Sequence, residues 1–337
     1  MINVRTNPLA ATSEPTTTGS TPARVNAPNA SPPDAPLLHA DFLRKLERLS
    51  ITPDKTPTVR LQGERRSNRR GASLEFADYR EYTAGDDLRY VDWKAYARLE
   101  KLFVKLFIAE EDLGIHLLLD ASESMDYAGE NASPDENKFT FARRTVAALG
   151  YVGLLRYDRV GVAGFAQGGT LDRGTAPRRV PSLRGRRSVP ELFGYLQTLR
   201  PGGRTDFSSA LADYARRAQT PGVCVVVSDF LDPHWEKGVK ALLARRFRVV
   251  LIHVLSAEET NPTLSGDLRL VDSETGAVRD VSVTPELLAR YKAALGAFCD
   301  SMEAVAAKYG MEYLRVSTAA PVEELLLNTL RKGGLLR

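Results

Sequence analysis

Short apolar runs alternate with helix-length amphipathic segments from Leu113 to the end of the chain, and this alternation constrains the fold more than any other feature. The strand-like runs are residues 115–119, 160–165, 223–227, 249–255 and 313–316. The segments with helical spacing are residues 138–155, 189–199, 207–218, 235–245 and 285–309. Such alternation predicts an α/β fold with a doubly wound, mainly parallel sheet that helices cover on both faces. Residues 268–271 and 278–281 predict an inserted β-hairpin.

Three regions follow from changes in composition along the chain. Residues 1–36 are dominated by Thr, Pro, Ala, Ser and Asn and predict a disordered tail. Residues 37–112 predict an N-terminal extension lobe, with a short helix in residues 37–49 and a strand in residues 102–108. Residues 113–337 predict the α/β domain.

The composition excludes several classes of protein. The 337 residues carry a formal net charge of +4, which is too small an excess to indicate a nucleic-acid binder. No apolar stretch has the length of about 18 residues that a membrane helix requires, and no signal peptide is recognisable. The two cysteines form no ligand spacing, and Cys224 lies inside an apolar run. We therefore expect a soluble, cytoplasmic protein without a membrane span.

Oxygen-bearing side chains follow the predicted strands at positions where ligands bind in doubly wound sheets. Asp120, Ser122 and Ser124 form a D-x-S-x-S sequence after the first strand of the α/β domain. Thr205 lies in the glycine-rich sequence P-G-G-R-T, and Asp229 ends the sequence V-S-D after another strand. Two carboxylates and three hydroxyls are ligands that suit Mg²⁺ or Mn²⁺, whereas zinc would require His or Cys. Each residue alone is explained as well by a helix cap or a turn, but their combination on this topology favours a metal site.

These motifs resemble the metal-ion-dependent adhesion site of von Willebrand factor A domains. The resemblance covers roughly residues 113–330 and is carried by D-A-S-E-S, G-G-R-T and V-S-D. It implies that the two serines and the threonine coordinate the cation, while the aspartates act directly or through water. It also implies an open coordination position for an acidic side chain of a partner.

A second resemblance concerns residues 75–98, with the sequence E-F-A-D-Y-R-E-Y-T-A-G-D-D-L-R-Y-V-D-W-K-A-Y-A-R. This stretch is similar to the signature of the bacterial domain-of-unknown-function family fifty-eight. Members combine the signature with an A-type domain and are commonly associated with MoxR-type AAA+ ATPases. Mixed charges and tyrosines in the signature favour a structural clamp between the lobe and the sheet, with a partner-binding surface as the alternative.

Two groups of arginines in polar segments are candidate partner-binding residues: Arg65, Arg66, Arg69, Arg70, and Arg178, Arg179, Arg184, Arg186, Arg187. Solvated loops explain them most simply, although they could meet phosphate or an acidic surface.

The common motifs for nucleotide binding, hydride transfer, acyl transfer and zinc proteolysis are absent from the sequence. We therefore expect a non-catalytic, divalent-metal-dependent adaptor, which binds a MoxR-type ATPase or its client through an acidic side chain and works in complex assembly or maturation. The alternatives are a metal-dependent phosphoester hydrolase, for which no general base is evident, and a nucleic-acid-binding protein, which we do not expect.

Overall fold

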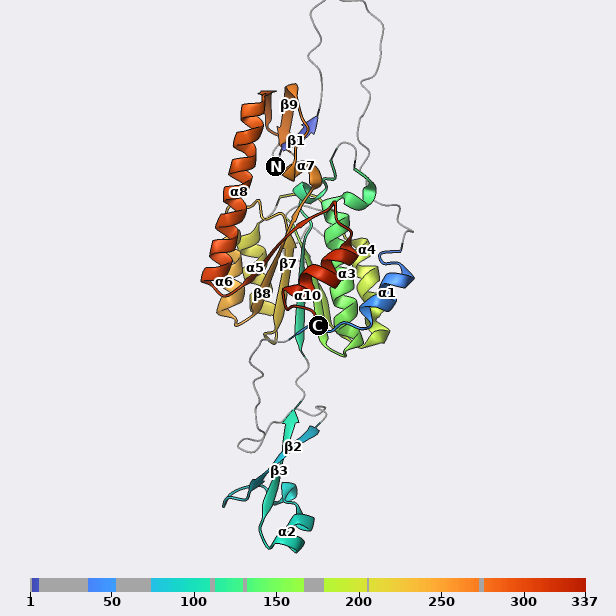
Figure 1. The fold of residues 1–337 in the computed structure, drawn as a ribbon, viewed down its shortest axis with the longest axis vertical. Coiled ribbons are helices and arrows are strands. Elements are labelled where there is room, and N and C mark those ends of the chain that lie inside the picture. Colours follow the sequence, from blue (N-terminus) through green and yellow to red (C-terminus); the bar gives the residue numbers. More distant parts are fainter. Residues whose placement is uncertain are drawn as a thin grey trace, which may run out of the picture. The chain divides into compact units, whose positions relative to one another are not determined.

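The computed structural model describes residues 2–5, 36–52, 74–109, 113–129, 132–166, 179–204, 206–272 and 276–337. They belong to two compact units (Figure 1). The larger unit comprises the described residues of Met1–Thr52 and Gly114–Arg337, and the smaller unit comprises those of Pro53–Leu113. Each unit is described by itself below.

A six-stranded sheet with the order β11-β8-β7-β4-β5-β6 forms the centre of the larger unit. Its strands are β4 (Gly114–Asp120), β5 (Arg159–Phe165), β6 (Arg179–Arg184), β7 (Val223–Ser228), β8 (Arg248–Leu255) and β11 (Glu312–Ser317). All neighbouring pairs are parallel except β5 and β6, which are antiparallel. This arrangement confirms a mixed α/β fold with a mostly parallel sheet.

The central strands are buried along their whole length, which explains their composition. Every residue of β4 and β7 is buried. A strand that helices cover on both faces shows a continuous apolar run instead of alternation between apolar and polar residues. The runs G-I-H-L-L-L-D and V-C-V-V-V-S have this character.

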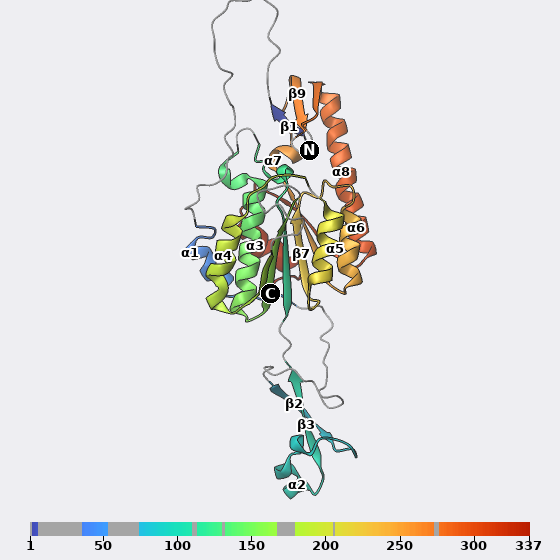
Figure 2. The ribbon, with the colours of Figure 1, turned by 180° about the vertical axis from the view of Figure 1, so that it is seen from behind.

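Helices cover both faces of the sheet (Figure 2). On one face lie α1 (Ala40–Leu46), α3 (Lys138–Leu155) and α4 (Val189–Thr198); on the other lie α5 (Phe207–Arg217), α6 (Trp235–Ala244) and α8 (Pro285–Lys308). Helices α5 and α6 approach closely at Gly238, where an added Cβ would lie 2.4 Å from the carbonyl oxygen of Phe207. The helix predicted in residues 37–49 and the five predicted after Leu113 are all present, with ends that differ by a few residues.

The larger unit also contains a small antiparallel sheet, two strands of which follow β8 in the chain. It contains β9 (Gly266–Asp272) and β10 (Val278–Val283), which form the predicted hairpin, and β1 (Ile2–Arg5) pairs with β9. Helix α7 (Ala257–Thr260) connects β8 to this hairpin. Of the tail predicted in residues 1–36, the structure describes only residues 2–5 and 36.

Several short helices complete the larger unit. They are η2 (Glu123–Met125), η3 (Pro134–Glu136), η4 (Arg186–Ser188), α9 (Val322–Glu324), a π-helical turn η5 (Leu325–Thr329) and α10 (Leu330–Lys332). The C-terminal residues return to the segment that follows α1, because the amide of Arg337 donates to the Ser50 carbonyl oxygen (2.8 Å) and the Ser50 amide donates to the Arg337 carbonyl oxygen (2.9 Å). These two backbone hydrogen bonds tie the C-terminal residue to the segment that follows α1.

The smaller unit contains the sequence signature. Strands β2 (Leu74–Glu81) and β3 (Phe103–Ala109) pair antiparallel, with η1 (Leu88–Tyr90) and α2 (Trp93–Leu99) between them. Asp92 caps α2 by accepting the amides of Lys94 (2.9 Å) and Ala95 (3.1 Å). Ion pairs inside the unit, such as Arg80 with Asp86 at 2.9 Å, account for part of the mixed charge of the signature.

Candidate metal centre

The candidate site lies where the strand order of the sheet reverses. From β4 the chain runs to β5 and β6 on one side, and it then returns to β7 on the other side of β4. Strands β4 and β7 are parallel neighbours, so their carboxyl ends lie side by side. Asp120 ends β4 and Asp229 directly follows β7. The fold thus brings two of the predicted ligands to the crevice where doubly wound sheets bind ligands.

The turn after β4 holds the D-x-S-x-S sequence in a compact arrangement. The backbone amide of Ser122 donates to Oδ1 of Asp120 (2.9 Å), which fixes this carboxylate over the turn. The turn continues into η2, where the hydroxyl oxygens of Ser122 and Ser124 lie 3.0 Å apart. All three side chains are buried, with exposed fractions of 0% for Asp120, 0% for Ser122 and 3% for Ser124.

The segment after β7 contributes a second carboxylate and a hydroxyl that links the two strands. Ser228 donates its hydroxyl to Oδ2 of Asp120 (2.6 Å) and accepts the Phe230 amide (2.8 Å). Oδ1 of Asp229 accepts the Leu231 amide at 3.4 Å, and the Asp229 side chain is buried. Both carboxylates are therefore oriented by bonds from neighbouring backbone or side-chain donors.

A buried lysine lies beside this group. Lys138 begins α3, and its Nζ contacts Oδ2 of Asp229 at 2.8 Å and Oε1 of Glu259 at 2.9 Å. The Lys138 side chain has an exposed fraction of 0%, which is tolerable only because carboxylates compensate the ammonium. Glu259 comes from α7, so the network joins three separate segments of the larger unit.

The two aspartates differ in their electrostatic surroundings. Burial and the nearby Asp229 carboxylate raise the pKa of Asp120 to about 7. Burial would also raise the pKa of Asp229, but the Lys138 ammonium and hydrogen bonds outweigh it, so that the pKa of Asp229 is lowered. The pKa of Lys138 is raised, because Asp229 and Glu259 outweigh the effect of burial. Asp229 is thus ionised in its ion pair, whereas Asp120 lacks a compensating cation of this kind and would gain one from a bound metal ion.

The donor set fits a small hard cation. Ligand oxygens on neighbouring positions of an octahedral Mg²⁺ at about 2.1 Å stand about 3 Å apart, and the hydroxyl oxygens of Ser122 and Ser124 have this spacing of 3.0 Å. Within the part of the chain that the structure describes, no three His, Cys, Asp or Glu side chains gather as a metal site. The candidate site would therefore depend on hydroxyl ligands, which suit Mg²⁺ or Mn²⁺ better than zinc.

Of the five predicted ligands, the structure brings together Asp120, Ser122, Ser124 and Asp229, while Thr205 lies outside the described residues. The glycine-rich loop before Thr205 does lie against the D-x-S-x-S turn. The Gly202 amide donates to the Ala121 carbonyl oxygen (2.8 Å), and the Glu123 amide donates to that of Gly203 (2.9 Å). Gly203 has a φ of +75°, a conformation that favours glycine.

Of the predicted partner-binding arginines, Arg184, Arg186 and Arg187 lie away from this site, whereas Arg179 pairs with Ala163 near the carboxyl end of β5. Arg184 pairs with Arg159 at the first residue of β5, which is the opposite edge of the sheet from the carboxyl end of β4. Arg186 and Arg187 follow in η4, where Arg186 forms an ion pair with Glu47 at 2.8 Å. Arg179 is described only by its strand. The remaining members lie outside the described residues: Arg65, Arg66, Arg69, Arg70 and Arg178.

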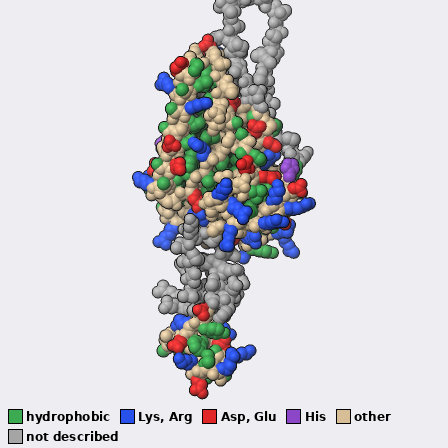
Figure 3. All heavy atoms as spheres, viewed as in Figure 1, with side chains coloured by type: hydrophobic (Ala, Val, Ile, Leu, Met, Phe, Trp, Pro, Cys, Tyr) green, Lys and Arg blue, Asp and Glu red, His purple; other side chains and the backbone are tan. Residues whose placement is uncertain are grey.

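Charge on the face seen in Figure 3 is interspersed, since basic and acidic side chains alternate over the larger unit. This face carries no broad basic field of the kind that phosphate backbones require.

Sequence reasoning missed three residues of the site: Ser228, Lys138 and Glu259. Ser228 was part of the V-S-D motif, but its bond to Asp120 depends on the pairing of β4 with β7. Lys138 begins a helix whose apolar periodicity does not reveal a buried charge. Glu259 had a local signal, because Ser256 and Glu259 form an S-x-x-E capping box at the start of α7.

A family model and several curated proteins match this chain. The family model described as protein of unknown function DUF58 matches residues 78–297, more than half of the chain. The uncharacterized protein Rv1480 of Mycobacterium tuberculosis is 30% identical over 221 residues, covering 64% of this chain and 66% of that relative. The chain thus spans slightly less than two thirds of the length of this relative. The uncharacterized protein MAV169 of Mycobacterium avium is 32% identical over 113 residues, covering 32% of this chain and 66% of that relative.

Solved structures that match this chain include the conserved hypothetical protein BatB from Bacteroides thetaiotaomicron, with 16% identity, a TM-score of 0.39, and coverage of 66% of this chain and 98% of that one. The pilus adhesin SpaC from Lactobacillus rhamnosus GG in its open conformation has 14% identity, a TM-score of 0.42, and coverage of 67% of this chain and 30% of that one. Among the described residues of this chain, no helix is both long and apolar enough to cross a membrane.

Proposed function

This chain belongs to the DUF58 family of proteins of unknown function, and we propose for it the role of a non-catalytic adaptor that binds an acidic side chain of another protein through a divalent cation. The carrying observation is the meeting of Asp120, Ser122, Ser124 and Asp229 at the carboxyl ends of two adjacent parallel strands. A geometry of this kind is also the expectation from the resemblance to the metal-ion-dependent adhesion site.

The chemistry of the site supports recognition of a carboxylate. Asp120, Ser122 and Ser124, with Asp229 directly or through water, would hold Mg²⁺ or Mn²⁺, and Thr205 would complete the set. The Asp229 carboxylate is shared with Lys138, so the two carboxylates neutralise a divalent ion only in part. A bound cation supplies Lewis acidity and an open ligand position, for which a carboxylate is the best neutral-pH donor. Affinity for the partner would therefore depend on the metal.

The partner that we propose is a MoxR-type AAA+ ATPase or its client, in complex assembly or maturation. This follows from the similarity of residues 75–98 to the family signature and from the association of such proteins with these ATPases. The smaller unit presents exposed large side chains in this stretch, including Leu88, Trp93 and Tyr96 with exposed fractions of 54%, 57% and 45%. Exposed apolar side chains in such density are typical of an interaction surface.

Hydrolysis of phosphoesters has weaker support. A metal-activated water needs a positioned base. The nearest carboxylates along the chain that are not predicted metal ligands are those of Glu123 and Asp126. Asp126 accepts a hydrogen bond from the side-chain amide of Asn137 (2.9 Å), which ties it to the start of α3. Glu123 has a raised pKa, caused first by burial and then by Asp126, and it belongs to the η2 turn. Neither feature favours a catalytic role over a structural one.

The test is the rate of dissociation from a purified MoxR-type ATPase of the same organism, measured by surface plasmon resonance. We expect EDTA and Ser122→Ala each to accelerate dissociation, because both disturb the central contact. Ser133→Ala is the matched control, since Ser133 is exposed and lies in the η3 cap. Binding that ignores both EDTA and Ser122→Ala would contradict the metal bridge even if a complex forms.

A further inference from the structure

The Lys138 ion pairs connect the candidate metal site to a helix that the metal site does not otherwise involve. Lys138 contacts Oδ2 of Asp229. The other carboxylate oxygen, Oδ1, accepts a hydrogen bond from the Leu231 amide. The second partner, Glu259, belongs to α7. All three charged side chains are buried, so water cannot replace one partner without cost.

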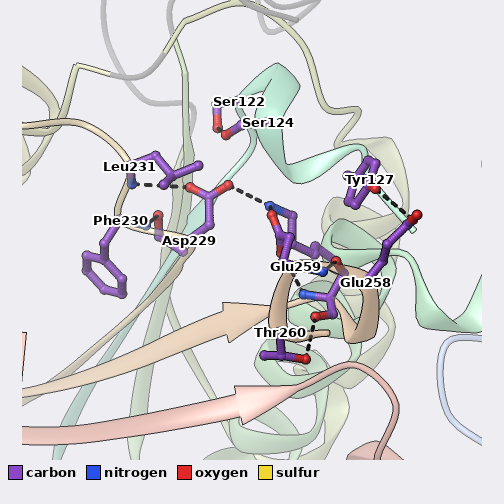
Figure 4. A network of polar contacts seen from close by, with 12 residues as sticks. Ser122, Ser124, Tyr127, Asp229, Phe230, Leu231, Glu258, Glu259 and Thr260 are labelled. Carbon is purple, nitrogen blue, oxygen red and sulfur yellow. Dashed lines mark hydrogen bonds and ion pairs between the residues drawn. The ribbon is translucent and has the colours of Figure 1, made fainter. Parts of the chain in front are cut away.

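Helix α7 is in turn held by contacts on three sides. The Ser256 amide donates to Oε2 of Glu259 (2.6 Å), so the two oxygens of one carboxylate serve Lys138 and the helix cap separately. The Tyr291 hydroxyl of α8 donates to the Glu259 carbonyl oxygen (2.9 Å). The preceding residue, Glu258, accepts the Tyr127 hydroxyl at 2.8 Å (Figure 4). Any shift of α7 must therefore be transmitted to Lys138 or break one of these bonds.

We propose that Lys138 is a positioning residue that couples Asp229 to α7 through Glu259, so that the state of α7 regulates how tightly the site holds its cation. The predicted change in Mn²⁺ affinity rests on the proposed function, whereas the coupling between α7 and Asp229 does not. The hairpin β9–β10 and helix α8 follow α7 in the chain, and a partner that moves them would change metal affinity at Asp229.

The direction of the coupling follows from charge. Glu259 shares the Lys138 ammonium with Asp229. When Glu259 withdraws, the ammonium is compensated by Asp229 more strongly, and this aspartate becomes a poorer partner for a metal ion. Because coupling free energies are reciprocal, metal binding must also alter the stability of α7. Helix α7 is only four residues long, so such a change is expected to appear as local opening.

The experiment compares Glu259→Gln with Glu258→Gln in the full chain. Both variants remove one negative charge from α7 with the same substitution, but Glu259 forms an ion pair with Lys138, whereas Glu258 accepts a hydrogen bond from Tyr127. We expect Glu259→Gln to weaken Mn²⁺ binding about fivefold or more, in the usual range of coupled sites, and Glu258→Gln to change it less than about twofold. In a Lys138→Met background, the relay predicts that the two glutamine variants bind Mn²⁺ equally. A difference that persists there would mean that charge acts through space, and it would overturn the relay.

Hydrogen exchange without metal tests the same connection independently of Mn²⁺ binding and of the folding of Lys138→Met. Glu259→Gln should slow exchange of the amides of Phe230 and Leu231 about threefold or more, because an ammonium that pairs with Asp229 alone holds this aspartate more firmly. Glu258→Gln should leave these amides unchanged. Equal exchange in the two variants overturns the relay. Absence of Mn²⁺ binding in the unsubstituted protein would instead remove the proposed function, while slower exchange in Glu259→Gln alone would still support the coupling of α7 to Asp229.

Discussion

Nζ of Lys138 lies 2.8 Å from Oδ2 of Asp229, and the two side chains have exposed fractions of 0% and 2%. This pair joins the first turn of α3 to the end of β7 at the candidate metal centre. Removing one member of a buried ion pair leaves the other charge uncompensated. We therefore expect Lys138→Met to lower the free energy of unfolding by about 3–5 kcal/mol, as measured by urea denaturation.

The matched control for this prediction is Arg144→Met on the same helix. Arg144 forms an ion pair with Asp135 at 2.8 Å, but the Asp135 side chain has an exposed fraction of 63%. An exposed pair contributes at most about 1 kcal/mol. Equal losses in the two variants would show that burial of the Lys138 network adds nothing to stability.

Two glycines in helices of the larger unit should respond oppositely to alanine. In Gly238→Ala the added Cβ would meet the Phe207 carbonyl oxygen at 2.4 Å, so α6 must move away from α5 and stability falls. In α8, an added Cβ at Gly296 has no heavy atom within 4 Å, so Gly296→Ala should stabilise by about 0.5–1 kcal/mol through helix propensity. Thermal unfolding of both variants decides this. A stabilising Gly238→Ala would contradict the close packing of α5 and α6.

The buried His116 predicts a loss of stability in mild acid. Burial lowers the pKa of His116 from 6.5 to about 4. The folded state therefore disfavours the protonated ring, so its contribution is complete above pH 6.5 and is lost as the pH falls toward 4. The full shift corresponds to about 3 kcal/mol. Unfolding free energies measured across this range should decline less steeply in His116→Gln than in the unsubstituted protein.

A control for this titration is His234→Gln, because the His234 side chain has an exposed fraction of 73%. The His116 prediction is wrong if the two variants have the same profile of unfolding free energy against pH.

Much of the larger unit could be predicted from the sequence, because its signals are local. Strands such as β7 are buried on both faces and show continuous apolar runs, and α3 shows apolar periodicity over several turns. Strand β6 was not predicted, since its sequence R-V-P-S-L-R contains a proline and three polar or charged positions, as an edge strand allows. Strand β2 was not predicted either, because the charged signature hides its alternation.

The candidate site was predictable where one turn carries several ligands, and it was not where the contact joins distant segments. Asp120, Ser122 and Ser124 lie within five consecutive residues, so their proximity follows from a single turn. The contact of Lys138 with Glu259 spans 121 positions and depends on how α7 packs beside α3. A lysine at a helix start is ordinarily solvated, and only the tertiary structure buries it.

The proposed metal centre requires that Asp120, Ser122, Ser124 and Asp229 together bind a cation, and calorimetric titration with Mn²⁺ measures this binding. We expect the unsubstituted protein to bind one ion, and Asp120→Ala to abolish binding because it removes the carboxylate that anchors the turn. Asp135→Ala, which changes an exposed carboxylate on η3, should bind as the unsubstituted protein does. Absence of Mn²⁺ binding in the unsubstituted protein, or undiminished binding in Asp120→Ala, would contradict the proposed metal centre.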